Sequence, residues 1–155
     1  MKALTFLFSL KAENYSLPLT VARIAIGLFF FASGFNKVFV PANQQLMLET
    51  LTEAGIFFPT VMAPFVAICE MIFGAFTALG FVTRLSGGVL MIISLVALFT
   101  VGIHQIPENL NVLTWYSWLL YLPEATYILI GFFLLVQGSG PFAIDRMILK
   151  RLRPH

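Results

Sequence analysis

The hydrophobic positions of this chain are gathered into four long runs separated by short polar segments. The runs extend over Leu17 to Val38, Phe58 to Phe81, Leu85 to Ile103 and Trp115 to Gln137. About 20 apolar residues in a helix cross the hydrocarbon core of a bilayer, and each run reaches that length. A helix also satisfies its own backbone polar groups, as lipid requires. The pattern predicts an all-α integral membrane protein, a bundle of four transmembrane helices.

The segments between the runs predict how the helices are connected. Gly80 to Ser86 is short, so the second and third spans are expected to be antiparallel neighbours. Between Pro41 and Gly55, apolar residues recur with helical spacing, at Leu46, Met47, Leu51 and Ala54. This spacing predicts a short helix on the outer membrane interface between spans one and two. An ordered loop without membrane contact is the alternative. No repeat or linker interrupts residues 1–155, which indicates a single domain.

The distribution of basic residues predicts the orientation. One side of the membrane collects almost all of the cations: Lys2, Lys11, Arg23, Arg84, Arg146, Lys150, Arg151 and Arg153. The other side has Lys37 alone, together with Glu49, Glu53 and Glu108. Cytoplasmic loops carry the excess of Lys and Arg, so both termini and the basic tail 139–155 are expected in the cytoplasm. Trp115 and Trp118 then lie at the outer interface, where such rings are enriched.

The composition excludes several classes of protein. The 155 residues are 59% hydrophobic and 10% charged, far from the roughly 25% charged residues of soluble domains, so the lipid bilayer is the first partner. A net charge of +2 without a basic stripe excludes nucleic acid as a partner. The single cysteine, Cys69, allows neither an internal disulfide nor a C-x-x-C pair. Redox chemistry would therefore require a borrowed cofactor, with none bound covalently.

Ionisable residues inside the apolar runs are the candidates for function, because a charge at bilayer depth costs about 2.5–3.5 kcal/mol. Arg23, Lys37, Glu70 and Glu124 are such residues. Helix rise places Arg23 about 9 Å from the cytoplasmic start of its span, and Glu70 and Glu124 about 18 and 14 Å from the outer starts of theirs. Both carboxylates are therefore expected near the midplane, where Arg23 could reach one of them. The sequence leaves open which one.

Small residues share helix faces with these charges in three of the spans, which indicates that the charged faces point into the bundle. These residues are Gly27 and Gly34 in the first span, Ala63, Ala67, Gly74 and Thr77 in the second, and Ser117, Gly131 and Gly138 in the fourth. Pro123 removes a backbone hydrogen bond to Leu119 and predicts a kink beside Glu124.

Two interpretations of the charged group remain open. In one, Arg23 neutralises Glu70 or Glu124 as a structural ion pair. In the other, Arg23, Lys37, Glu70 and Glu124 line a pocket that binds the polar head of a lipophilic molecule such as a quinone, or handles protons, with His104 at its rim. Catalytic residues are not identified. His104 and Glu108 are separated by Pro107 and have no third ligand, so no metal site is predicted.

Several short motifs together resemble the DoxX family of small bacterial inner-membrane proteins. They are Arg23 with Gly27 and Phe35-Asn36-Lys37, Ala54-Gly55-Ile56 before Pro59, Glu70 with Gly74, Leu79 to Arg84, His104, and Gly138-Ser139-Gly140-Pro141 before Ile144-Asp145-Arg146. The resemblance implies a four-helix membrane bundle. Members look like membrane subunits tied to quinone-reducing thiosulfate oxidation or oxidative-stress defence, and related proteins act as assembly factors or cargo receptors. Nothing here matches a thiosulfate site, and Glu124 maps onto none of these motifs.

These observations lead to a ranked expectation for function. The first is a membrane subunit of a redox or oxidative-stress assembly that binds a quinone or similar lipophilic ligand, with a protein partner or as a homo-oligomer. The alternative is a non-enzymatic scaffold or assembly factor whose charges only hold the bundle together. A proton-coupled small-solute carrier ranks third, because four spans without inverted repeats offer little machinery for alternating access. Whether the chain is an enzyme is left open, and its expected location is the bacterial inner membrane.

Overall fold

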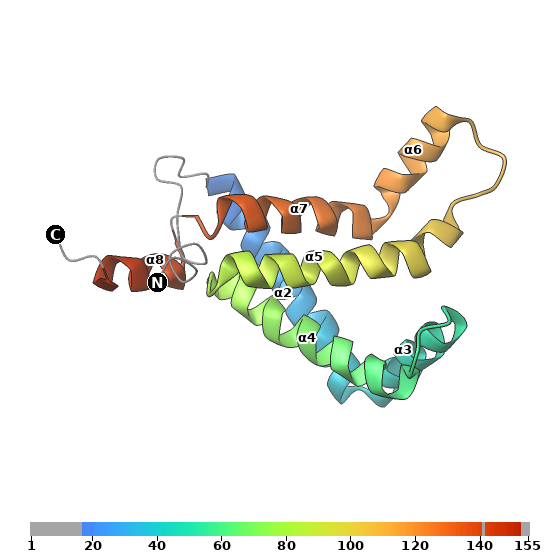
Figure 1. Cartoon of the computed structure of the whole chain (residues 1–155), viewed down its shortest axis with the longest axis horizontal. Coiled ribbons are helices and arrows are strands. Elements are labelled where there is room, and N and C mark those ends of the chain that lie inside the picture. Colours follow the sequence, from blue (N-terminus) through green and yellow to red (C-terminus); the bar gives the residue numbers. More distant parts are fainter. Residues whose placement is uncertain (1–16, 141, 153–155) are drawn as a thin grey trace.

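The computed structural model describes residues 17–140 and 142–152, and the regular structure in these ranges is helical. The elements in chain order are α2 (Leu17–Phe39), α3 (Pro41–Glu53), α4 (Pro59–Leu79), α5 (Thr83–Thr100), the 3₁₀ helix η1 (Gly102–Gln105), α6 (Val112–Tyr121), α7 (Pro123–Gln137) and α8 (Ile144–Leu152) (Figure 1). The predicted all-α class is confirmed. Lys2, Lys11, Arg153 and Pro141, which entered the orientation or family argument, lie outside the described residues.

The first three predicted spans are confirmed as helices. α2, α4 and α5 are each long and apolar enough to cross a membrane. Their ends lie within three residues of the predicted ones. The predicted short connection between spans two and three is also present, and it turns at Gly80, which ends α4 in the left-handed region with a φ of 71°. Glycine adopts this conformation without the steric cost that a Cβ would bring.

The fourth span is not the single helix expected over 115–137. α6 and α7 are separate helices bent by 72° relative to each other, so the described residues provide three spans, or four if this bent pair crosses together. Leu122 between them is extended, with a ψ of 128°, because the residue before a proline is disfavoured in the helical region. Pro123 then begins α7. The predicted effect of Pro123 is thus located correctly but is larger than a kink.

Two short helices lie outside the spans. α3 coincides with the helix predicted between spans one and two, and none of its residues is buried. Its contact with the membrane surface stays a prediction. α8 lies within the segment that the sequence identified only as a basic tail. Its polar and apolar residues fall on different faces, and Asp145 in its first turn is buried.

The described spans pack as two close pairs, α2 with α4 and α5 with α7. A Cβ added at Gly34 would lie 2.4 Å from the Met71 nitrogen, and one added at Gly131 would lie 2.8 Å from the Met91 Cβ. Glycines therefore permit near backbone contact in both pairs. A core of Ile26, Phe30, Leu90 and Leu134 joins them. The pairs meet near the α4–α5 turn and diverge toward α3 and α6 (Figure 1).

The predicted inward faces agree with this packing in two helices and only partly in the fourth span. Arg23, Gly27 and Gly34 are buried in α2, and the whole predicted face of α4 is buried. In the fourth span Gly131 and Gly138 are buried, but Ser117 is exposed. Ser117 belongs to α6, which the break at Leu122 directs away from the bundle.

Candidate functional site

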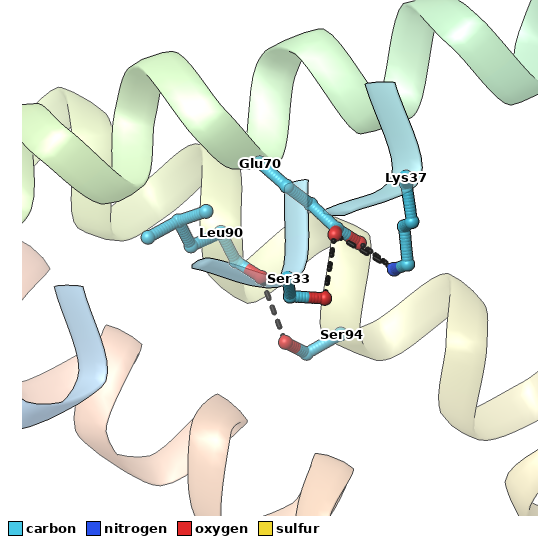
Figure 2. Close-up of polar contacts among 5 residues, drawn as sticks. All are labelled: Ser33, Lys37, Glu70, Leu90 and Ser94. Carbon is cyan, nitrogen blue, oxygen red and sulfur yellow. Dashed lines mark hydrogen bonds and ion pairs between the residues drawn. The ribbon is translucent and has the colours of Figure 1, made fainter. Parts of the chain in front are cut away.

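Lys37 and Glu70 form an ion pair between α2 and α4. The Lys37 Nζ lies 2.9 Å from Oε1 and 2.7 Å from Oε2 of Glu70, and the Ser33 hydroxyl donates a hydrogen bond of 3.2 Å to Oε2 (Figure 2). The Glu70 side chain is 6% exposed and that of Lys37 is 27% exposed. Ser33, Lys37 and Glu70 are called the α3-end cluster below, because they lie toward the end of the bundle that carries α3.

The helix crossing explains why these side chains meet. Ser33 and Lys37 are four residues apart and share one face of α2. The close approach of Gly34 to Ala67 and Met71 brings that face against the buried face of α4 that carries Glu70. Ser33 is six residues from the end of α2, about 9 Å along the helix axis. Glu70 was expected near the middle of the membrane, but its contacts with Ser33 and Lys37 place it near the α3 end of α2. The start of α4 therefore extends past the end of α2.

The α3-end cluster keeps a hydrogen-bonding capacity that its internal contacts do not use. The Lys37 ammonium carries three donors, and the two Glu70 oxygens occupy at most two of them. Figure 2 also draws the buried Ser94 of α5, whose hydroxyl donates a hydrogen bond of 2.9 Å to the Leu90 carbonyl of its own helix. Lys37 is the exposed member. It can donate to a carbonyl oxygen of a molecule that approaches between the helix pairs.

Arg23 does not meet either carboxylate, which corrects the predicted pairing with Glu70 or Glu124. Its Nη1 donates to the carbonyls of Thr77 at 3.2 Å and Ala78 at 3.3 Å, and its Nη2 donates to the Phe142 carbonyl at 2.5 Å. The side chain is 1% exposed. Arg23 lies 14 residues before Lys37, about 21 Å along α2. At that level it meets the last carbonyls of α4, where the hydrogen-bond ladder of the helix ends. The Thr77 carbonyl also accepts a bond of 3.1 Å from the Gly80 nitrogen.

Asp145 is a second buried charge near Arg23, and the sequence argument did not identify it as a site residue. Its Oδ1 accepts a hydrogen bond from the Val82 nitrogen at 2.6 Å, and its Oδ2 accepts one from the Thr83 nitrogen at 2.9 Å. Asp145 thereby caps α5, and it lies close enough to attract the Arg23 guanidinium. Its 3% exposure shows that it is buried. Arg23 and Asp145, with their backbone partners, are called the turn-end cluster below.

The Ile144-Asp145-Arg146 motif was the available signal for this role. This motif contributes to the family resemblance. Asp145 was not among the candidate charged residues, because it lies outside the apolar runs. The contacts of the turn-end cluster are to backbone groups of α4, α5 and the segment before α8. Such contacts fix helix ends relative to one another. The turn-end cluster therefore joins the end of α4, the start of α5 and the segment before α8.

Glu124 lies in the first turn of α7 and is half-buried. Its Oε2 is buried and has no hydrogen-bond partner in the described part of the chain. A Cβ added at Gly102 would lie 3.4 Å from this oxygen, so the glycine leaves room beside it. One turn further along α7, the ring of Tyr127 lies 4.8 Å from that of Phe29 and 5.3 Å from that of Phe30. These contacts place the Glu124 helix against α2.

The structure thus separates the predicted site residues. Lys37 and Glu70 are together, Arg23 is at the opposite end of α2, and Glu124 lies on another helix. His104 is exposed in η1, next to the end of α5. Within residues 17–140 and 142–152, no three His, Cys, Asp or Glu side chains are grouped closely enough to hold a metal ion.

Comparison with known proteins identifies the family. The sequence profile of the DoxX family matches residues 18–103, which contain α2 to α5. The chain is 30% identical over 135 residues to the inner membrane protein YqjF of Escherichia coli K12, a match that covers 84% of this chain and 92% of the relative. No solved structure matches. With its apolar helices, this relationship supports a multi-pass location in a bacterial inner membrane. The chain belongs to the DoxX family.

Proposed function

We propose that this protein is a membrane subunit of a redox or oxidative-stress assembly and binds a quinone or a similar lipophilic molecule at the α3-end cluster. The observation that supports the proposal is the state of Lys37, a cation in a membrane-spanning helix that is paired with Glu70 but still 27% exposed. A quinone head carries two carbonyl oxygens and no charge. One carbonyl can accept the remaining hydrogen bond of the ammonium without disrupting the ion pair.

The cost of the ion pair supports a ligand over a purely packing role. Burying two charges costs several kcal/mol each before their attraction offsets it, and apolar residues of similar volume often stabilise a protein as well or better. Glycines already hold α2 and α4 in contact. Burial of the polar groups of Ser33, Lys37 and Glu70 therefore costs free energy that helix packing alone does not require. An ionisable residue inside a membrane span is for this reason a candidate functional residue.

The arrangement of the helix pairs is compatible with an elongated apolar ligand. The pairs diverge toward the end that carries the α3-end cluster (Figure 1). A ligand head at Lys37 would have its tail among the exposed apolar side chains of the spans. We propose that a protein partner carries the electrons. The described residues of this chain contain one cysteine, Cys69, and a single cysteine cannot form a dithiol redox pair within the chain.

The proposal is tested by thermal unfolding of the purified protein in detergent with and without a short-chain benzoquinone. Quinone at a hundredfold excess over its Kd should stabilise the wild type by about 2.7 kcal/mol. Lys37→Met should lose this stabilisation because it removes the donor. Glu53→Gln, an exposed change on α3, is the control and should keep it. Absence of quinone stabilisation in the wild type would contradict the proposal.

The alternative, a scaffold or assembly factor, is favoured by a different observation. The contacts of Arg23 are to main-chain carbonyls of α4 and of the segment before α8, which is the behaviour of a structural group. In a scaffold, Lys37→Met and Glu70→Gln would change the stability of the bundle without any effect of quinone. Loss of a partner protein from the membrane on deletion of this chain, together with no quinone effect, would favour the scaffold.

A further inference from the structure

Of Arg23, Lys37, Glu70 and Glu124, the charged residues predicted inside the apolar runs, Glu124 is the one that neither cluster includes. Its Oε2 is buried beside Gly102 without a hydrogen-bond partner in the described part, although the residue as a whole is half-buried. A buried polar group without a partner costs about 1–3 kcal/mol. No contact within the described residues offsets that cost. An incoming hydrogen-bond donor would offset it.

Helix register places Glu124 level with the α3-end cluster. The Tyr127 ring contacts Phe29 and Phe30, so this point of α7 lies opposite that point of α2. α2 and α7 run in opposite directions, because two membrane crossings, α4 and α5, lie between them in the chain. One turn toward the α3 end therefore leads from Phe29 and Phe30 to Ser33 on α2, and from Tyr127 to Glu124 on α7. Glu124 and Ser33 thus stand at the same level on neighbouring helices.

We infer that Glu124 is the second anchor of the ligand site and accepts a hydrogen bond from a hydroxyl group of the ligand. This inference rests on the proposed function, because Lys37 supplies the first anchor. The two anchors have opposite character. Lys37 only donates hydrogen bonds, whereas a carboxylate oxygen accepts them. A molecule that carries a carbonyl in one state and a hydroxyl in another could accept from Lys37 in both states but could donate to Glu124 only as the hydroxyl.

The class of ligand follows from this opposition. A hydroquinone donates hydrogen bonds through its hydroxyls, whereas the corresponding quinone only accepts them through its carbonyls. Glu124 therefore favours the reduced form, whereas Lys37 can donate to an oxygen of either form and is the only one of the two anchors that the oxidised form can use. The break at Leu122 places Glu124 in the first turn of α7, where the chain leaves the bundle and a ligand can approach.

The two tryptophans of the chain provide a local signal for this site. Trp115 and Trp118 both lie on α6, immediately before the break that precedes Glu124. Bound benzoquinone is expected to quench their fluorescence, and titration gives its Kd. Displacement of the quinone by the hydroquinone, under anaerobic conditions, gives the Kd of the reduced form. The variants are Glu124→Leu, Glu124→Gln and Lys37→Met, with Glu108→Gln as an exposed control.

The expected result is a change in selectivity. Glu124→Leu should weaken hydroquinone binding about tenfold or more and leave the quinone Kd within about twofold, because only the reduced form has donors for the carboxylate. Lys37→Met should weaken quinone binding more than hydroquinone binding. Glu108→Gln should change neither. Glu124→Gln keeps an acceptor oxygen and the side-chain length, so it should lie between the wild type and Glu124→Leu.

Each outcome bears on one of the two claims. If quinone quenches the wild type and Lys37→Met abolishes this effect, but Glu124→Leu weakens both forms equally or neither, the second anchor is wrong and the proposed function stands. If neither form binds the wild type, the proposed function fails and the second anchor fails with it. If Glu124→Leu does not fold, the selectivity of Glu124→Gln decides, and an unchanged ratio of the two Kd values overturns the inference.

Discussion

Arg23 and Lys37 lie on the same helix but have different kinds of partner. Arg23 presents a planar fork of donors, and it reaches two carbonyls of α4 and one before α8 at once. The Lys37 ammonium is a compact charge, and it donates to both carboxylate oxygens of Glu70. The guanidinium is suited to several fixed carbonyls. The ammonium is suited to one carboxylate and keeps a third N–H donor for another acceptor. This difference is why we propose a structural role for Arg23 and a binding role for Lys37.

We predict that Arg23→Met lowers the free energy of unfolding by about 3 kcal/mol, because the buried α4 carbonyls and Asp145 would lose a partner. Arg23→Lys should recover only part of this loss, since an ammonium has three donors on one nitrogen and lacks the wide planar fork with which the guanidinium reaches the carbonyls of α4 and of Phe142. Arg151→Met, an exposed arginine on α8, is the matched control and should change stability by less than about 0.5 kcal/mol. Denaturant unfolding in detergent measures all three. Equal stability of Arg23→Met and wild type would contradict the structural role.

At the scale of elements, glycines decide which helices form close pairs. In α2 and α4, Gly27, Gly34 and Gly74 each lie where a Cβ would approach backbone atoms of the other helix within 2.4 Å. In α5 and α7, Gly87 and Gly131 have the same function at slightly longer distances. Without a hydrophobic force between helices in lipid, such van der Waals contact is what holds spans together. The close pairs are therefore expected to respond to a single added methyl group.

We predict that Gly34→Ala destabilises the protein by about 1–3 kcal/mol, because its Cβ would lie 2.4 Å from the Met71 nitrogen and α2 would have to move away from α4. Gly88→Ala is the matched control on α5, where the nearest atom is the flexible Leu135 Cδ1 at 3.4 Å. It should be neutral or slightly stabilising, since alanine is the better helix former. Unfolding of both variants in detergent gives the comparison. A larger effect at Gly88 than at Gly34 would show that the helix pairing is wrong.

The break between α6 and α7 is also an element-scale property. Pro123 prevents Leu122 from adopting helical geometry, and Asn111 caps α6 through a 2.8 Å hydrogen bond from the Thr114 nitrogen. Both signals are local. The 72° angle between the two helices is not local, because it depends on α7 packing against α5 while α6 has no buried residue.

The whole molecule is held together more tightly at one end than at the other. The turn-end cluster, the α4–α5 turn and the core of Ile26, Phe30, Leu90 and Leu134 connect the two helix pairs. Toward α3 and α6 the pairs diverge (Figure 1). The proposed ligand site lies at that more open end, and the structural charges lie at the closed end. Binding and fixation are thus separated along the bundle.

The orientation of the molecule is predicted from its basic residues, with the turn end in the cytoplasm. Single cysteines at Gln45 on α3 and at Lys150 on α8, in a Cys69→Ser background, test it in intact cells. A membrane-impermeant maleimide should label the cysteine at position 45 and should label the one at position 150 only after the cells are opened. Both positions are exposed, so reactivity reports the side of the membrane. Labelling in the reverse pattern would overturn the assignment.

Properties that depend on local pattern and on the solvent could be predicted from the amino-acid sequence. Runs of apolar residues predicted α2, α4 and α5 within two or three residues, because lipid requires long helices. Proline predicted the position of the break at Leu122, and small residues predicted the inward faces of α2 and α4. These features arise from residues close together in the chain, so periodicity and composition are sufficient to find them.

Which charges meet depends on how the helices pack against one another. Arg23, Glu70 and Glu124 were expected together because the rise per residue gave each an approximate depth in the membrane. A depth measured along one helix does not report how far that helix is shifted relative to the others. It also does not report the order of the helices around the bundle. The close crossing of α2 and α4 matched Lys37 with Glu70, and it left Arg23 beside the end of α4. The turn-end role of Asp145 depends on contacts more than 60 residues apart in sequence. Such contacts are set by packing between helices, which no periodicity along one helix encodes.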